Sequence, residues 1–127
     1  MLGFVMVGTN TLNEAANFYD ILLEILDLKR VCTTDRYVGY ALKNNSENIE
    51  FYVTMPVNLE RATSGNGTQI SFITQTKKNV NKFYETGINL GGKSEGAPDI
   101  RSGYYYSYLR DLDGNKICAF TKINKWR

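Results

Sequence analysis

The sequence predicts an α+β fold in which two βαβββ modules are paired within one domain spanning residues 1–127. Three observations predict it: the order of strand-like and helix-like segments repeats, the helix-like segments are amphipathic, and the strand-like segments alternate. The first module covers about residues 1–56 and the second about residues 68–123, with a polar, irregular stretch between them. A chain of 127 residues can bury a core without a disulfide or a metal.

The first module opens with a β-rich run at residues 2–8. Thr11 and Glu14 have the spacing of a capping box, which predicts that a helix begins here with the Thr11 hydroxyl accepting from the third helical N–H. Apolar side chains then recur with a period of about 3.6 over residues 12–26, so this helix should bury one face. Turn-rich segments separate the three strands that follow, at residues 28–34, 37–42 and 49–55.

The second module repeats this order with one weak element. Residues 68–75 predict a strand, Thr76 a helix N-cap, and Gly87 the end of that helix. The Gly- and Pro-rich segment 91–98 stands where the second strand of the module is due, and a strand is only faintly indicated there. Two further strands, at residues 104–110 and 116–123, are joined by a hairpin turn at residues 111–115.

The two halves can be aligned, and the alignment assigns faces to four of the strands. In the first strand and the helix, corresponding residues of the two halves differ by 65 in number, so Phe4 corresponds to Gln69. In the last strand they differ by 68, so Glu50 corresponds to Cys118. Successive side chains of a strand point to opposite faces. One face is apolar and should pack under the helices: Val5, Val7, Phe51, Val53, Ile70, Phe72, Ile117 and Ala119. The opposite, mixed face holds Phe4, Met6, Glu50, Tyr52, Gln69, Ser71, Cys118 and Phe120.

A sheet with one helix-covered face and one mixed face suggests a curved mixed sheet around a cleft, with the helices on the convex face and a ligand on the inner surface. The alternative is a mixed face that is solvated or covered by a partner protein. Tyrosines at residues 104–106 and at Tyr108 would add stacking surfaces to such a cleft. They are equally compatible with strand propensity and packing between subunits.

Composition narrows the chemistry that the chain can perform. It contains 0 His, which excludes Ser-His-Asp and Cys-His catalysis and zinc sites built on His. The formal net charge of +2 is too balanced to indicate a nucleic-acid partner. No apolar run is long enough to span a bilayer and no basic segment opens the chain, so we expect no membrane partner and no secretory signal. Cys32 and Cys118 are then expected to be reduced thiols in the cytoplasm.

Several motifs within this duplicated order resemble those of the vicinal oxygen chelate superfamily, which includes glyoxalase I, extradiol dioxygenases and bleomycin-resistance proteins. They are Phe18-Tyr19, Gly65-Asn66-Gly67-Thr68 and the segment Arg110-Asp111-Leu112-Asp113-Gly114-Asn115-Lys116-Ile117. The resemblance covers almost the whole chain. It implies paired βαβββ modules around a U-shaped cleft, commonly in a homodimer.

In the metal-dependent branch of the superfamily, four cleft-facing side chains hold one divalent ion, and the matching positions here are Phe4, Glu50, Gln69 and Cys118. Only Glu50 keeps the ligand type of the family. The phenyl ring of Phe4 has no lone pair, the amide of Gln69 is a weak ligand, and the thiolate of Cys118 is a soft one. We therefore expect no metal and no cofactor. Cys118 is expected to be an inert inward thiol.

The resemblance and the lost ligands together favour a small-molecule-binding protein, whose partner is a small organic ligand with aromatic compounds among the candidates. The expected lining is Phe4, Met6, Tyr52, Gln69, Ser71, Tyr106, Cys118 and Phe120. The alternative is a glyoxalase-like lyase or isomerase in which Glu50 is the base, with an atypical metal or none. A third reading is a structural or regulatory dimer with an empty cleft. Whether the chain is an enzyme stays open at this point.

Overall fold

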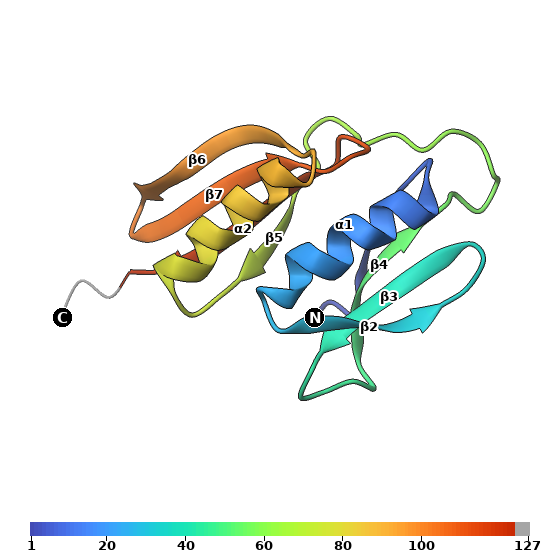
Figure 1. The fold of residues 1–127 in the computed structure, drawn as a ribbon, viewed down its shortest axis with the longest axis horizontal. Helices are drawn as coiled ribbons and strands as arrows, with labels where there is room; N and C mark the ends of the chain where they lie inside the picture. The colour runs from blue at the N-terminus through green and yellow to red at the C-terminus, as the bar shows by residue number, and fades with distance from the viewer. Residues whose placement is uncertain (124–127) are drawn as a thin grey trace.

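The structure, a computed structural model, describes residues 1–123, so the last four residues of the predicted domain lie outside the described part (Figure 1). Its elements follow the βαβββ order twice. The first module consists of β1 (Val5–Gly8), α1 (Leu12–Glu24), β2 (Leu28–Thr33), β3 (Tyr37–Leu42) and β4 (Ile49–Thr54). The second consists of β5 (Ile70–Ile73), α2 (Lys77–Asn89), β6 (Lys93–Arg101), β7 (Tyr104–Arg110) and β8 (Lys116–Lys122).

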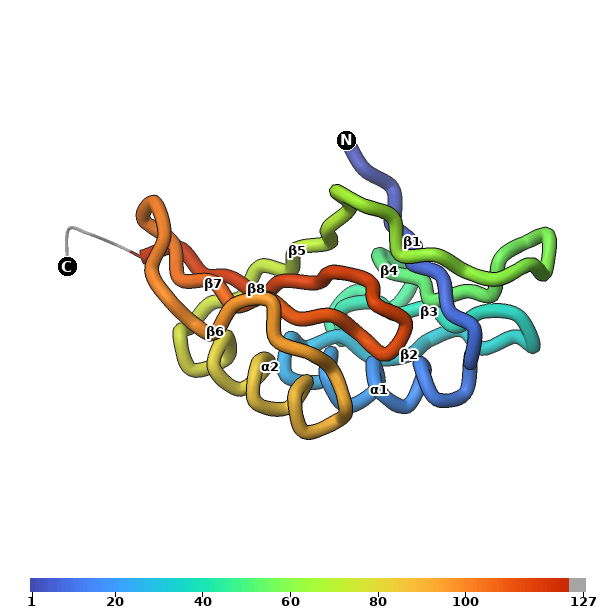
Figure 2. The backbone as a smooth tube through the Cα atoms, turned by 90° about the horizontal axis from the view of Figure 1, so that it is seen from above, coloured from blue at the N-terminus to red at the C-terminus, as the bar shows by residue number. Residues whose placement is uncertain are grey.

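The strands form two four-stranded mixed sheets rather than one continuous sheet. Their orders are β1-β4-β3-β2 and β5-β8-β7-β6, with β1 parallel to β4, β5 parallel to β8, and the other neighbours antiparallel. Both helices lie on the same side of the two sheets, as the views in Figures 1 and 2 show. The predicted α+β fold of two paired modules is therefore confirmed. No helix within residues 1–123 is long and apolar enough to cross a bilayer.

One hydrophobic cluster lies between the helices and both sheets. All eight residues of the predicted apolar face belong to this cluster or pack against it, so that face assignment is confirmed. Phe51 of β4 meets Phe72 of β5 edge to face with 5.3 Å between ring centroids, and this contact joins the two modules. Burying an aromatic or aliphatic side chain of this size contributes roughly 1.5–3 kcal/mol. The core therefore stabilises each module and also their junction.

The hairpin turn at residues 111–115 holds the second module against the first. The Tyr19 hydroxyl on α1 donates to Asp111 at 2.5 Å, and the Asn115 amide donates to the Gly8 carbonyl at 2.8 Å. Burial raises the pKa of Asp111, while four hydrogen bonds, the one from Tyr19 foremost, act to lower it. Burial beside Asp111 also raises the pKa of Tyr19. Residues 111–115, part of the segment that most specifically resembles the superfamily, therefore join the two modules, and we call them the clasp.

Asn10, between β1 and α1, completes this junction and also positions the linker. Its backbone N–H donates to the Asp113 carboxylate at 2.9 Å. Its side-chain amide accepts from the N–H of Ala62 at 2.7 Å and donates to the Ala62 carbonyl at 3.3 Å. The linker between modules is therefore attached to the loop that the clasp also contacts.

The start of α1 differs from the prediction, while the start of α2 agrees with it. Thr11 is the N-cap of α1, but its side chain makes no capping hydrogen bond, so the predicted capping box with Glu14 is wrong. Instead, the Thr11 N–H donates to the hydroxyl of Thr9 at 3.0 Å. Thr76 caps α2 as predicted, because its hydroxyl accepts from the Asn79 N–H at 3.1 Å.

The end of α2 also differs from the prediction. The helix continues through Gly87 to Asn89, and the glycine that follows its C-cap with a left-handed backbone is Gly91, at φ +102°. Gly87 is needed for another reason. A Cβ atom at this position would lie 2.2 Å from Cδ1 of Leu109, so the absent side chain makes room for the core of the second module.

The segment predicted to be irregular, residues 91–98, contributes most of β6. This strand occupies the edge of its sheet and pairs with β7 only, with register shifts on both sides of Gly96. Pro98 is accommodated there because an edge strand with bulges does not need every N–H for pairing. The weak sequence signal thus reflects an edge strand rather than a missing one.

The strand register corrects the alignment of the repeat. Val5 pairs with Phe51 in the first module and Ile70 with Ile117 in the second. Val5 to Ile70 is a shift of 65, as predicted, whereas Phe51 to Ile117 is a shift of 66. The predicted shift of 68 in the last strand is therefore wrong by two residues. Because side chains alternate with a period of two, the assignment of faces is unaffected.

Candidate functional site

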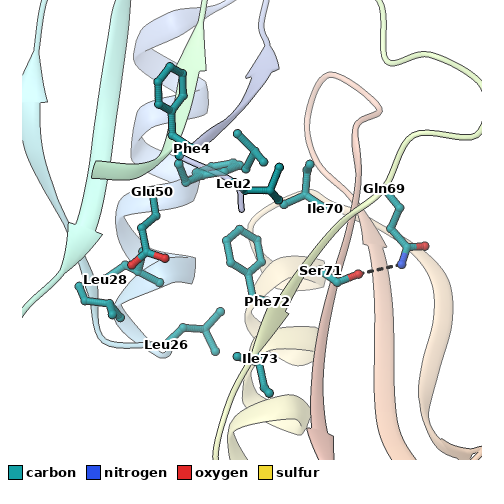
Figure 3. Close-up of a pocket in the computed structure, with 14 residues that line it drawn as sticks. Leu2, Phe4, Leu26, Leu28, Glu50, Gln69, Ile70, Ser71, Phe72 and Ile73 are labelled. Carbon is teal, nitrogen blue, oxygen red and sulfur yellow. Dashed lines mark hydrogen bonds between the residues drawn. The ribbon is translucent and has the colours of Figure 1, made fainter. Parts of the chain in front are cut away.

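A pocket of about 400 Å³ lies between the two modules, where β1 and β5 begin (Figure 3). Four of the predicted site residues line it: Phe4, Glu50, Gln69 and Ser71. The first two belong to the first module and the last two to the second. Most of the remaining wall is apolar and includes Leu26, Leu28, Phe51 and Phe72. The structure thus brings half of the predicted mixed face around one opening.

Among residues 1–123, Glu50 supplies the only charged side chain that lines this inter-module pocket. Glu50 lies on the side of the first module, and the Phe72 ring separates it from Ser71 and Gln69, whose side-chain amide donates to the Ser71 hydroxyl at 2.9 Å (Figure 3). Glu50 is exposed and makes no hydrogen bond or ion pair with any other residue in the described range. The carboxylate is therefore free to meet a ligand.

The mixed face of the first module is aromatic and open. Phe4 and Tyr52 meet edge to face at 5.0 Å between centroids, and Tyr52 meets Tyr37 in the same way at 5.6 Å. Phe4 is 56% exposed and Met6 48% exposed. Tyr37 was missed as a member of this face, although the alternation used for the other strands would have identified it on β3.

A second pocket, of about 390 Å³, lies on the second module between β6, β7 and the start of β8. Of the predicted site residues, only Tyr106 lines it. Its ring stacks with Tyr108 at 5.6 Å and with Phe120 at 5.4 Å between centroids. The residues predicted to form one site are therefore not brought together: four line the inter-module pocket, Tyr106 lines the second pocket, and Met6, Tyr52, Cys118 and Phe120 line neither. Arg101 and Lys116 also line the second pocket and were not among the predicted site residues.

Cys118 lies beneath this aromatic row, across from Ser71 in the register of β5 and β8. It is fully buried, and burial raises the pKa of its thiol to about 11, even though Ser71 and Lys116 act in the opposite direction. A thiol with such a pKa is protonated near neutral pH and is a poor nucleophile and a poor metal ligand. These properties support the prediction of an inert inward thiol.

The comparisons with known proteins place this geometry in a family. A glyoxalase/bleomycin resistance protein from Albidiferax ferrireducens T118 is 37% identical, with a TM-score of 0.87, over 96% of this chain and 98% of that one. The chain belongs to the glyoxalase/bleomycin resistance protein family. The resemblance to the vicinal oxygen chelate superfamily is thereby confirmed. No protein-family model matches the sequence, and no curated protein matches it.

More distant members of the glyoxalase/bleomycin resistance protein family share the fold alone. A glyoxalase/bleomycin resistance protein/dioxygenase family enzyme from Burkholderia phytofirmans PsJN is 17% identical, with a TM-score of 0.73, over 95% of this chain and 98% of that one. A lactoylglutathione lyase from Agrobacterium tumefaciens is 16% identical, with a TM-score of 0.66, over 95% of this chain and 92% of that one. At these identities the similarity establishes architecture, and the chemistry has to be argued from the site.

The metal that the wider superfamily implies does not fit the residues of this family member. Phe4 offers no lone pair, and Cys118 is a buried, protonated thiol. The register places Lys116, a cation, at the position equivalent to Glu50. Within residues 1–123, no three Cys, Asp or Glu side chains lie close enough together to hold a metal ion. A catalytic metal needs about three good protein ligands in fixed geometry, which this arrangement does not provide.

Proposed function

We propose that this member of the family is a small-molecule-binding protein whose ligand occupies the inter-module pocket. The observation that carries the proposal is the convergence of Phe4, Glu50, Gln69 and Ser71 on an apolar opening of about 400 Å³. Pockets of a few hundred Å³ with apolar walls and a few polar groups, placed at the junction of two structural units, are typical of small-molecule sites. The relative from Albidiferax ferrireducens T118, which is described as a glyoxalase/bleomycin resistance protein, agrees with such a role.

The pocket suits an organic molecule with an apolar body and a few polar groups. Phe72 and Phe51 supply aromatic contact area, and the Ser71 hydroxyl and Gln69 amide can orient polar atoms of the ligand. Glu50 can accept hydrogen bonds from a ligand N–H or O–H because it has no partner within residues 1–123. These features support binding directly, whereas a reaction would need an acid or base whose pKa is matched to it.

We also propose that the protein is a homodimer. Phe4, Met6 and Ile73 are all about half exposed or more, at 56%, 48% and 67%. They lie on the mixed side of the two sheets, opposite the helices. Phe4 and Met6, two residues apart on the same face, place exposed apolar side chains next to each other, and an exposed apolar patch marks an interaction surface. Sedimentation of the wild-type protein should give twice the chain mass, and Met6→Lys should shift it towards the monomer, whereas the exposed Ile21→Lys on α1 should not.

The binding proposal is tested by filling the pocket. Gln69→Trp would place an indole at its rim, and Gln75→Trp would place one at an exposed position just beyond β5. A thermal-shift screen of aromatic metabolites and antibiotics should yield compounds that raise the midpoint of wild-type unfolding. Gln69→Trp should weaken their binding about tenfold or more, and Gln75→Trp should leave it unchanged. Failure of every compound to bind at millimolar concentration, or equal binding by both variants, would contradict the proposal.

The same compounds separate binding from catalysis. If the wild-type protein converts a bound compound, and Glu50→Gln abolishes the conversion while the compound still binds, the protein is an enzyme with Glu50 as its base. If the compound is recovered unchanged from the wild-type protein, the chain binds without turnover, which is the outcome we expect.

A further inference from the structure

The second pocket contains two cations that converge on one tyrosine. The Arg101 guanidinium donates to the Tyr108 hydroxyl at 3.4 Å, and the Lys116 ammonium lies over the ring of the same tyrosine, 5.3 Å from its centroid. Neither cation forms an ion pair with any residue in the range 1–123. A long hydrogen bond to a neutral hydroxyl and a cation–π contact leave most of the donors of both groups free.

The acidic side chains of this pocket are already engaged. Glu95 is paired with Arg110, with 2.6 Å between Oε1 and Nε, and this pairing lowers the pKa of the Glu95 carboxyl. Asp99 accepts a hydrogen bond from the N–H of Ile100 at 2.8 Å. Glu95 is therefore neutralised mainly by Arg110, although Lys116 contributes to the field at Glu95. Asp99 keeps its negative charge, and the two cations Arg101 and Lys116 outweigh it, so the net charge left facing the pocket is positive.

Flat aromatic surface lies beside these cations. The Tyr106 and Tyr108 rings are nearly parallel, 10° apart, and Phe120 extends the row with an angle of 26° to Tyr106. The bulged β6 opens the cavity of about 390 Å³ above them. Gly96 lets the edge strand approach, because a Cβ there would lie 3.0 Å from the Tyr108 ring.

We infer that this pocket is a second binding site, which takes a small aromatic carboxylate. The carboxylate would bind the Arg101 guanidinium and the Lys116 ammonium, since charge-assisted hydrogen bonds to a carboxylate are about twice as strong as neutral ones and a guanidinium matches its two oxygens. The aromatic part would lie along Tyr106. This site is separate from the inter-module pocket, whose single charge is the carboxylate of Glu50.

The test compares 2-naphthoate with 2-naphthamide, which have the same rings and differ in charge. Each compound is titrated into the full-length protein and followed by two-dimensional amide NMR. We expect naphthoate to bind at least about tenfold more tightly than naphthamide and to shift the amide signals of Arg101, Tyr106, Tyr108 and Lys116. Arg101→Gln and Lys116→Gln should each weaken naphthoate binding by about tenfold to a hundredfold and leave naphthamide binding unchanged.

Lys29→Gln, an exposed substitution on β2 of the other module, removes the same charge from the chain and serves as the matched control. It should leave the affinity for naphthoate unchanged, and thermal unfolding should show that all three variants are folded. Equal affinity for the two compounds, an equal effect of Lys29→Gln and Arg101→Gln, or shifts confined to Phe4, Ser71 and their neighbours would overturn the inference. The last result would still support the inter-module pocket, so the two proposals can fail separately.

Discussion

The mixed faces of the two modules have the same architecture and opposite charge. The register places Glu50 of β4 and Lys116 of β8 at equivalent positions, one step before the paired residues Phe51 and Ile117. Glu50 lines the pocket between the modules, whereas Lys116 lines the pocket of the second module together with Arg101, Glu95 and Asp99. A duplicated backbone therefore does not imply a duplicated site, because these equivalent positions carry opposite charges and line different pockets.

The helices show the same principle in the core. The shift of 65 places Leu22 of α1 at the position of Gly87 of α2. Leu22 is fully buried, whereas Gly87 leaves room for the fully buried Leu109 from β7. In the first module, both Leu22 from the helix and Tyr40, the sheet residue equivalent to Leu109, are fully buried. In the second module only the sheet supplies a side chain at this pair of positions, because close packing leaves no room for one on Gly87.

The largest expected effect comes from breaking the contact that the modules share. Asp111→Ala should destabilise the protein by about 3 kcal/mol, because it leaves the buried Tyr19 hydroxyl without its acceptor and removes one of the two acceptors of the Asn115 side-chain amide. Asp113→Ala, which removes one acceptor of a backbone N–H, should lower stability by only about 1 kcal/mol. Urea denaturation measures both. Equal effects of the two variants would show that Asp111 does not hold the modules together.

Gly87→Ala tests the asymmetry between the helices. The added methyl group meets Leu109 at 2.2 Å, and overpacking of this kind lowers stability by about 1–3 kcal/mol. Leu109→Ala should cost less stability in the Gly87→Ala background than in the wild-type protein, because the shorter side chain relieves the clash, so a double-mutant cycle should give a clear coupling energy. Strict additivity of the two substitutions would mean that the positions do not compete for the same space.

Cys118 of β8 is equivalent to Tyr52 of β4, because the last strands of the two modules align with a shift of 66 residues, and its thiol should make stability depend on pH. Burial raises the pKa of Cys118 to about 11, so the folded protein retains a proton that the unfolded chain loses above about 8.5. This contribution to stability is present below about pH 8.5 and is lost as the pH rises towards 11. Between pH 8.5 and 10, the wild-type protein should lose about 1 kcal/mol more stability than Cys118→Ala does.

Urea denaturation at several pH values measures this difference, with Cys32→Ala, in the first module, as the control. Identical pH profiles for the wild-type protein and Cys118→Ala would show that the thiol titrates normally. Iodoacetamide should modify Cys32, which is half-buried, well before Cys118.

The smallest effects are expected at the two charges of opposite sign. Glu50→Gln should change stability by no more than about 0.5 kcal/mol, because Glu50 is exposed and unpaired within residues 1–123. Lys116→Gln should lower stability by about 0.5–1 kcal/mol through loss of its contact with the Tyr108 ring. Thermal unfolding can compare them. A large loss for Glu50→Gln would assign that carboxylate a structural role.

Much of the fold could be predicted from the sequence, because the helical period of apolar residues and their alternation along strands are visible without tertiary information. The two helices, the apolar face and the turn at residues 111–115 followed from these signals. The edge strand β6 was indicated only faintly, because its bulges and Pro98 interrupt the pattern. The predicted end of α2 was wrong because Gly87 is needed to make room for Leu109 and does not end the helix. Leu109 is distant in the sequence, so no local rule connects the two residues.

The candidate site was less accessible to sequence reasoning. Alternation identified the residues of the mixed face, but it could not show which of them line a pocket, because that depends on how the two sheets meet. The alignment of the last strands was wrong by two residues, which hid the equivalence of Glu50 and Lys116. The error was not apparent from the sequence, because a shift of two residues leaves every side chain on the same face of the sheet. The pairing of Glu95 with Arg110, which leaves Arg101 and Lys116 free, depends on side-chain geometry across β6 and β7.

The clasp at residues 111–115 has a consequence for recognising relatives of this chain. Its acidic and amide groups are occupied in joining two halves of one polypeptide, so they are required for folding whatever the pockets bind. A protein could therefore retain this signature while its ligand, or any reaction, changed completely. Similarity in residues 111–115 therefore indicates a shared fold. The outward-facing residues of the last strand of each module indicate which ligand a given relative binds.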